Sequence, residues 1–356
     1  MKKKIIIIGG ILILIISSII IGFIVHKLNI DQKFPKEYEF AVIDTTSQLN
    51  KSFIYYYDDL GKKVYEKLYK MGYMGDTFSC PQVYNNKVYV TPWGTAKERE
   101  LTVILEIDKE NGNYKTYDTT LRSINSLAIT DKYFFAVNNF NGVSKLARTN
   151  RETEETTIKE FPKHIILQIN IFNNILYAFA SLEDTSELIE IDLETMEEIC
   201  RTDVTKYGEC PPSGVLMEEG SLYFTLPFNY GEDSDNLLVY DTKTKEIKEI
   251  KLPDALPCQL LKYQQYIIIS HINNITDEGN SLSILDIETG KIENYQLENT
   301  PSQIYIKDNF LYSLDITDRN ICRYELVDNR IKFIDQIFID KRDTDLHYFL
   351  TGLYFN

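Results

Sequence analysis

The chain has little of the side-chain chemistry on which most enzyme and metal sites depend. Its 356 residues include one Trp, four His and five Cys. No Cys-x-x-Cys, His-x-x-x-His or His-x-Glu spacing occurs, so nothing in the sequence indicates a zinc site. The Gly-x-Ser-x-Gly, Gly-x-x-x-x-Gly-Lys and Gly-x-Gly-x-x-Gly motifs are also missing, which removes the common signals of a serine nucleophile, a phosphate loop and a dinucleotide site.

Oxygen ligands suited to calcium occur together in one acidic run, Gly231 to Asn236. The run lacks the spacing and the distal bidentate Glu of a calcium loop, so a solvated loop is the better interpretation. We therefore expect no cofactor, and calcium binding would have no support from this pattern.

A turn followed by an apolar run, usually centred on an aromatic residue, occurs seven times. The spacings between successive runs are 45, 43, 46, 44, 45 and 42 residues. The runs are anchored at Tyr89, Phe134, Tyr177, Tyr223, Ile267, Tyr312 and Tyr354. A period of about 40 to 50 residues with several strands per unit is typical of β-propeller blades.

A second repeat, an alternating strand that ends in an acidic turn, interleaves with the first. It recurs around Asp58, Asp108, Asn150, Asp192, Asp241, Asp286 and Glu325. Alternation with a period of two, followed by an Asx or Gly turn, indicates a β-hairpin. Together the two series predict an all-β fold: a seven-bladed β-propeller with four-stranded antiparallel blades over residues 38–356.

The order of the hairpins predicts how the ring closes. The chain begins with an acidic-turn hairpin, Ser52 to Leu68, and ends with an aromatic one, Asp345 to Asn356. We expect these two halves to pair in a blade shared between the termini, because this leaves no open sheet edge in the ring. The strand-like segment Tyr38 to Ile43 either adds to this blade or lies along its rim.

The acidic-turn hairpins, such as Leu237 to Ile247, resemble the repeats of YncE-like (YVTN-type) and quinoprotein-like β-propellers. The resemblance covers about residues 38–356 and implies a propeller, but its motif describes a blade and not a site. Quinoprotein repeats usually carry a Trp in each blade, whereas this chain has only Trp93. That departure argues against a pyrroloquinoline quinone cofactor.

Two Cys residues are close enough in sequence to suggest a disulfide. Cys200 and Cys210 are expected on an outer strand and in the next inter-blade loop, so a bridge is not implied by their spacing. We favour free thiols that pack as small hydrophobic side chains.

The N-terminus predicts a membrane anchor. Residues 5–25 are 21 uncharged, mainly apolar residues, and as a helix they would span about 32 Å, close to the hydrocarbon thickness of a bilayer. Lys2, Lys3 and Lys4 precede them, so we expect residues 1–4 in the cytoplasm, 5–25 across the cell membrane, 26–37 as a linker and the propeller outside. No Ala occurs before Ala41, which argues against a cleaved signal peptide.

The charge of the exported part restricts its partners. After Lys27 there are 34 basic and 53 acidic residues. This excess of acidic residues disfavours nucleic acid and anionic lipid as partners, because both require a basic face. The simplest explanation of the charge is solubility. We expect a monomer that binds a protein or another ligand of the cell envelope.

The register of the repeats also predicts a binding face. Nine residues before each anchor, at the mouth of the central channel, lie Cys80, Asn125, Gln168, Gly214, Cys258, Gln303 and Asp345. Loops on the same face add Trp93, Asn138, Phe140, Phe228, Tyr230 and His271. From these and His347 we select the candidate ligand-binding residues Trp93, Asn125, Phe140, Gln168, Tyr230, His271, Gln303, Asp345 and His347. The amides could instead bind ordered water, and the aromatic residues could cap the blades.

Two classes of function stay open. The first, which we favour, is a membrane-anchored extracytoplasmic binding or scaffolding module, because no catalytic constellation occurs. The second is a hydrolase or lyase resembling the propeller lactonases and lyases, with its site at the channel mouth. Asp345 and His347 would then be the nearest acid–base or metal-binding candidates.

Overall fold

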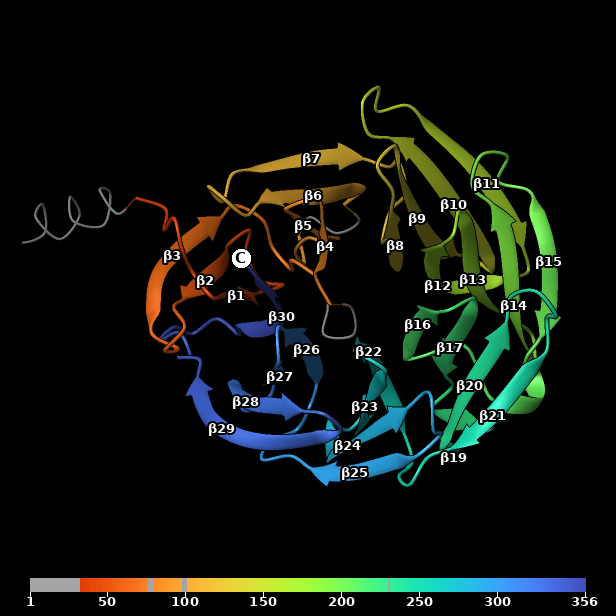
Figure 1. Ribbon diagram of the computed structural model, residues 1–356. Helices are drawn as coiled ribbons and strands as arrows, with labels where there is room; N and C mark the ends of the chain where they lie inside the picture. Colours follow the sequence, from red (N-terminus) through yellow and green to blue (C-terminus); the bar gives the residue numbers. More distant parts are fainter. Residues whose placement is uncertain (1–32, 76–79, 98–100, 230) are drawn as a thin grey trace, which may run out of the picture.

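The computed structural model describes residues 33–75, 80–97, 101–229 and 231–356. These residues form a ring of seven four-stranded antiparallel sheets (Figure 1). Two short strands, β18 (Phe228–Asn229) and β19 (Glu232–Asp233), form an additional hairpin. The all-β seven-bladed propeller predicted from the repeats is therefore confirmed.

The only helical element of the described residues is a 3₁₀ turn, η1 (Thr205–Tyr207). No helix in this part of the chain is long and apolar enough to cross a membrane. The expected anchor at residues 5–25, together with the tail before it and most of the linker, lies outside the described residues.

Blades 1 to 6 are each built from consecutive segments of the chain. Blades 1 and 2 comprise β4 (Gln82–Tyr84), β5 (Lys87–Val90), β6 (Val103–Asp108) and β7 (Tyr114–Asp118), then β8 (Ser126–Ile129), β9 (Tyr133–Phe140), β10 (Val143–Asn150) and β11 (Thr156–Pro162). Blades 3 and 4 comprise β12 (Ile165–Phe172), β13 (Ile175–Leu182), β14 (Thr185–Asp192) and β15 (Glu198–Asp203), then β16 (Gly214–Glu218), β17 (Ser221–Thr225), β20 (Asn236–Asp241) and β21 (Ile247–Lys251). Blades 5 and 6 comprise β22 (Pro257–Tyr263), β23 (Tyr266–Asn273), β24 (Glu278–Asp286) and β25 (Ile292–Gln296), then β26 (Gln303–Lys307), β27 (Phe310–Asp315), β28 (Asn320–Val327) and β29 (Arg330–Phe338). The first strand of each lies nearest the centre of the ring (Figure 1).

Blade 7 is shared between the two chain ends, but in a different proportion from the expected one. Its order is β3 (Lys63–Tyr69), β2 (Ser52–Tyr57), β1 (Phe40–Thr45) and β30 (Phe349–Phe355). The C-terminus therefore supplies one strand, not a hairpin, and the segment that begins at Tyr38 supplies the second strand of the blade. The run at Tyr354 belongs to the innermost strand, whereas the other six anchors lie on second strands. All six residues of β1 are buried, so this short strand can occupy the middle of the sheet.

Seven hydrophobic clusters stabilise the ring, one between each pair of neighbouring blades. The turns fit their sequences. Asn85-Asn86 and Asn173-Asn174 connect first to second strands with positive φ at both residues, as a type I′ turn requires. In the acidic turns the aspartate accepts backbone N–H groups two and three residues later, as Asp286 does from Glu288 and Thr289.

All five Cys residues are free thiols, so no bridge joins Cys200 to Cys210. This agrees with the favoured interpretation of these residues as packing groups.

Candidate functional site

The antiparallel strands divide the connections between two faces of the ring. The loop face consists of the loops between second and third strands, such as 274–277 and 316–319, and the loops that enter first strands, such as 297–302. The turn face consists of the inner turns, such as 85–86, and the acidic turns, such as 287–291.

Six of the seven positions expected at the channel mouth lie at or within a few residues of the start of a first strand. The seventh, Asp345, is exposed and precedes β30 by four residues. Gly352 of β30, rather than Asp345, lies beside the channel-mouth residue Gln303. A Cβ atom there would lie 2.9 Å from the Gln303 Oε1 atom and 2.4 Å from the Pro81 Cδ atom. The nine-residue spacing gave the wrong position in blade 7 because the Tyr354 run lies on the first strand of this blade, whereas the other six anchors lie on second strands.

The channel-mouth amides connect blades to one another. Gln303 is 2% exposed; its Nε2 donates to the Thr351 carbonyl at 3.2 Å, and its Oε1 accepts the Tyr305 hydroxyl. Gln259, which the register did not select, exchanges two hydrogen bonds of 2.8 Å with the backbone of Ile304 in the next blade. Gln303 and Gln259 therefore connect neighbouring blades by hydrogen bonds. The signal for Gln259 was its place next to an expected position, Cys258.

Asn125 and Gln168 differ in their surroundings. The Asn125 Oδ1 accepts from the backbone and side chain of Asn139 at 3.1 and 3.2 Å. Gln168 is half-buried beside a bulge in β12 and forms no side-chain hydrogen bond with described residues. A cavity of about 50 Å³ beside Cys80 and Asn125 has room for little more than ordered water, which fits the alternative interpretation of these polar residues.

His271 is a buried residue of β23 and does not face solvent. Its Nδ1 lies 3.0 Å from the Ala255 carbonyl and its Nε2 lies 2.8 Å from the Ser283 hydroxyl. Burial lowers the pKa of the imidazole, against smaller opposing effects from the Ala255 carbonyl and the Asp254 charge. A neutral ring that donates from Nδ1 and accepts at Nε2 satisfies both contacts.

The expected aromatic and charged residues have separate neighbours. Trp93 is half-buried with its ring 5.5 Å from that of Tyr73, and its indole N–H has no hydrogen-bond partner among the described residues. Phe140 is 65% exposed at the end of β9. His347 is exposed and stacks on Phe349. Tyr230 lies outside the described residues.

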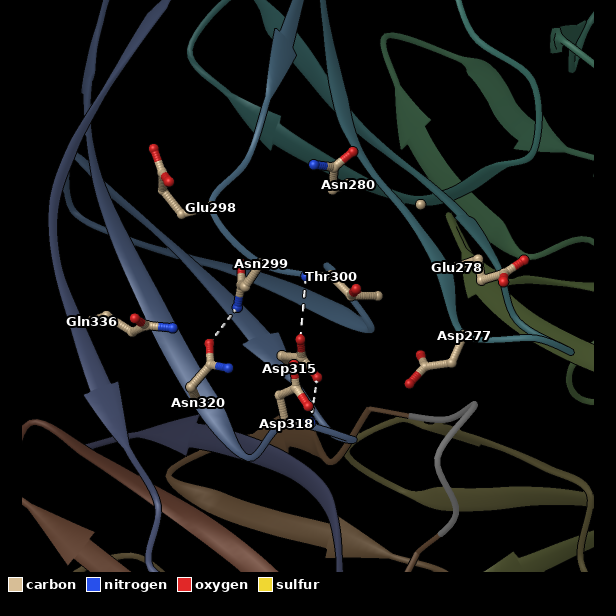
Figure 2. Close-up of a pocket in the computed structure, with 11 residues that line it drawn as sticks. Asp277, Glu278, Asn280, Glu298, Asn299, Thr300, Asp315, Asp318, Asn320 and Gln336 are labelled. Carbon is tan, nitrogen blue, oxygen red and sulfur yellow. Dashed lines mark hydrogen bonds between the residues drawn. The ribbon is translucent and has the colours of Figure 1, made fainter.

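The loop face carries a larger feature, an acidic pocket of about 420 Å³ between blades 5 and 6 (Figure 2). It is lined by Asp277, Glu278, Gly279, Asn280, Glu298, Asn299, Thr300, Asp315, Asp318, Asn320 and Gln336. Five of these residues are acidic and none is basic. A cleft with one sign of charge concentrates ligands of the opposite sign.

Hydrogen bonds hold the floor of the acidic pocket in place. The Asn299 Nδ2 donates to the Ser313 carbonyl at 3.0 Å and to the Asn320 Oδ1 at 2.9 Å. Asp277 of blade 5 accepts the hydroxyls of Ser302, at 3.1 Å, and Thr317, both of blade 6. The side chains where blades 5 and 6 meet are therefore held in place before any ligand binds.

Asp315 is the most deeply buried carboxyl of the pocket, with 3% of its surface exposed. Burial raises its pKa, and the charges of Asp318 and Asp277 add to the effect. Backbone N–H groups of Asp318 and Thr300, at 2.8 and 3.3 Å, oppose the rise. This carboxyl therefore keeps a proton to higher pH than an ordinary aspartic acid.

No group of three or more His, Cys, Asp or Glu side chains in the described part of the chain is arranged to hold a metal ion. In the acidic run at residues 231–236, Glu232 and Asp233 form β19, and Asp235, between β19 and β20, pairs with Lys251.

No protein-family model matches the chain, and no curated protein matches it. Solved structures match most of its length. A candidate 6-phosphogluconolactonase from Bacteroides fragilis is 14% identical, with 92% of this chain and 100% of that chain covered and a TM-score of 0.60. Its counterpart from Bacteroides uniformis is 11% identical, with 90% and 100% covered and a TM-score of 0.60. A protein of unknown function from Desulfotomaculum acetoxidans is 10% identical, with 83% and 95% covered and a TM-score of 0.56.

At these identities the similarity shows the fold alone. It supports a seven-bladed propeller and does not place the chain in the YncE-like or quinoprotein-like family.

Proposed function

We propose that this protein is a membrane-tethered extracytoplasmic binding module, and that its loop face recognises a cationic ligand rich in hydrogen-bond donors. The observation that carries the proposal is the acidic pocket, with five acidic residues, no basic residue and a volume of about 420 Å³. Amino groups and hydroxyls are the ligand groups that such a lining pairs with best. The tether is supported by the sequence of residues 5–25.

Calorimetric titration of the full chain in detergent tests the binding function. Suitable probes are spermidine, a short lysine-containing peptide and glucosamine, each compared with its N-acetylated form. We expect the amines to bind and the acetylated forms to bind at least several-fold more weakly, because acetylation removes the charge.

Matched variants locate the site. Glu298 and Asp318 are exposed at the pocket, so Glu298→Gln with Asp318→Asn should weaken amine binding without loss of the fold. Glu219→Gln with Asp343→Asn makes the same charge change at exposed positions outside the pocket. Equal loss in both double variants would mean that only the net charge matters, and would reject the pocket as the site.

A hydrolase is the second candidate, favoured by the raised pKa of Asp315 in a concave pocket. Asp315 would exchange a proton with the substrate. A phosphorylated lactone, the substrate type that the names of the two Bacteroides proteins indicate, would be repelled by the acidic lining, so an uncharged or amine-bearing lactone fits better. Lactone hydrolysis that Asp315→Asn abolishes, without a change in thermal stability, would favour this candidate over the binding module.

A further inference from the structure

We infer that the turn-face corner of blades 7 and 1 rests against the bilayer surface, so that the acidic pocket faces away from the membrane. The corner consists of residues 33–37, 58–63 and 109–113, and we call it the tether corner. The inference rests on the proposed function, because it assumes that residues 5–25 hold the chain in the membrane.

Phe34 attaches the start of the described chain to the tether corner. Its ring lies 5.0 Å from that of Tyr56 and 5.5 Å from that of Tyr65, both at steep interplanar angles. On its other side it approaches Gly112 so closely that a Cβ atom there would lie 2.6 Å from the Phe34 ring. Figure 1 shows this segment, in red, at the rim of the ring beside β3. The chain therefore leaves the propeller from one defined place on the turn face.

The length of chain before Phe34 limits how far this corner can lie from the membrane. Only residues 26–33 separate it from the end of the apolar run at Val25. Fully extended, eight residues reach about 28 Å, and less in any folded form. A short connection to a fixed attachment point restricts rotation of the whole propeller.

The charge of the tether corner suits a surface of anionic headgroups. The tether corner contains five basic and four acidic residues, whereas the rest of the chain after Lys27 contains 29 basic and 49 acidic ones. Lys33, Lys36 and Lys62 are exposed and form no ion pair with described residues. Leu60, in the same β2–β3 turn as Lys62 and next to the exposed Asp59, is 81% exposed. The total charge of the chain, which disfavours anionic lipid, conceals this local difference.

Tryptophan quenching in vesicles tests the orientation. The full chain is reconstituted into phosphatidylcholine–phosphatidylglycerol vesicles that contain lipids with a nitroxide on the headgroup. Leu60→Trp and Ile275→Trp, each in a Trp93→Phe background, place the single Trp at the tether corner or on the loop face. The two positions are matched, because Leu60 and Ile275 are 81% and 79% exposed. We expect several-fold stronger quenching at position 60 than at position 275 or at Trp93 in the unaltered chain.

Equal quenching at positions 60 and 275, or stronger quenching at 275, would overturn the orientation. A chain that does not float with vesicles after a high-salt wash would instead reject the tether, and the orientation with it. Lys36→Glu with Lys62→Glu should reduce the quenching at position 60 roughly twofold or more, because the double change replaces attraction to the anionic headgroups by repulsion. Lys243→Glu with Lys248→Glu, the matched change on blade 4, should leave it unaltered, and equal effects of the two pairs would show that the corner charge does not matter.

Discussion

The junction between blades 7 and 1 and the junction between blades 2 and 3 are built differently. The first contains four buried tyrosines, Tyr38, Tyr56, Tyr69 and Tyr354, among its apolar side chains. The second contains Ile, Leu, Val, Ala, Phe and Met as its buried residues and no buried tyrosine among those described. The first joins segments from both ends of the chain, whereas the second joins blades that follow each other in sequence.

Tyrosine hydroxyls form directional hydrogen bonds in this cluster, and one of these bonds joins the two ends of the chain. Tyr354 donates to Tyr56 at 3.2 Å, across 298 residues of sequence. Tyr69 donates to the Gly112 carbonyl at 2.9 Å and Tyr38 to the Lys109 carbonyl at 3.2 Å. Apolar packing is not directional, whereas a hydrogen bond specifies one geometry. The chain break lies inside blade 7, between β1 and β30, and the bond from Tyr354 to Tyr56 fixes the C-terminal strand to the N-terminal part of that blade.

The most severe test of the comparison removes the C-terminal strand. Deletion of residues 349–356 should abolish cooperative folding, because it exposes the edge of β1 and the apolar faces packed against Leu350, Leu353 and Tyr354. Thermal unfolding followed by circular dichroism measures this, with deletion of Asn356 alone as the control. An unchanged midpoint after the longer deletion would show that blade 7 does not close the ring.

The next largest effect is expected at a buried ion pair of blade 7. Asp44 is fully buried, 3.0 Å from the Arg319 guanidinium of blade 6, and accepts the Tyr55 hydroxyl at 2.8 Å. Asp44→Asn leaves a buried Arg without its counter-charge and should lower the free energy of unfolding by about 3 to 5 kcal/mol.

Glu190 provides the counterpart at a contiguous junction. It is also buried, but its partner Lys245 is partly exposed, so Glu190→Gln should cost less than Asp44→Asn. Urea unfolding of both variants gives the two values. A larger loss for Glu190→Gln would contradict a special role for the blade 7 contacts.

Two glycines in equivalent acidic turns test the packing against Gly112, where a Cβ atom would approach the Phe34 ring most closely and the Lys67 Cδ atom next. Gly112 and Gly290 have φ of 65° and 72°, so alanine is similarly strained at both. Only at Gly112 would the new Cβ meet the Phe34 ring, since nothing lies within 4 Å of Gly290. Gly112→Ala should therefore be about 1 to 3 kcal/mol more destabilising than Gly290→Ala. If urea unfolding gave the same decrease in the free energy of unfolding for both variants, the close contact between Phe34 and Gly112 would be refuted.

The smallest effect of a single substitution is expected on alkaline stability. Burial raises the pKa of Tyr38, Tyr56, Tyr69 and Tyr354 above that of an unfolded tyrosine, near 10. The stabilising contribution of each is complete below pH 10 and is lost as the pH rises toward its folded pKa. In that range, each of these tyrosines lowers the free energy of unfolding by about 1.4 kcal/mol per pH unit.

Tyr56→Phe should reduce this pH dependence by the share of one tyrosine, whereas Tyr114→Phe, at an exposed position, should leave it unchanged. Unfolding free energies between pH 9 and 11 provide the measurement. An identical pH dependence in all three chains would refute the proposed role of the buried hydroxyls.

The candidate site was harder to predict than the fold. Cys80, Asn125, Gln168 and Gln303 were placed correctly near the first strands, because period and register are local properties of the repeats. Asp345 was misplaced, because nothing local distinguishes a first strand from a second strand when both are apolar. The acidic pocket was not predicted, since its residues come from three loops and from strands β24, β27, β28 and β29, which meet only when blades 5 and 6 pack together.

The amino-acid sequence by itself determined the number of blades, the turn chemistry and the alternation of each strand, because these depend on residues within about 45 positions of one another. Only the tertiary structure decided that β1 lies between β2 and β30, that Phe34 packs against Gly112, and that five acidic residues share one pocket. The physical reason is that pairing and burial between distant segments are set by competition over the whole chain, which a local pattern does not record.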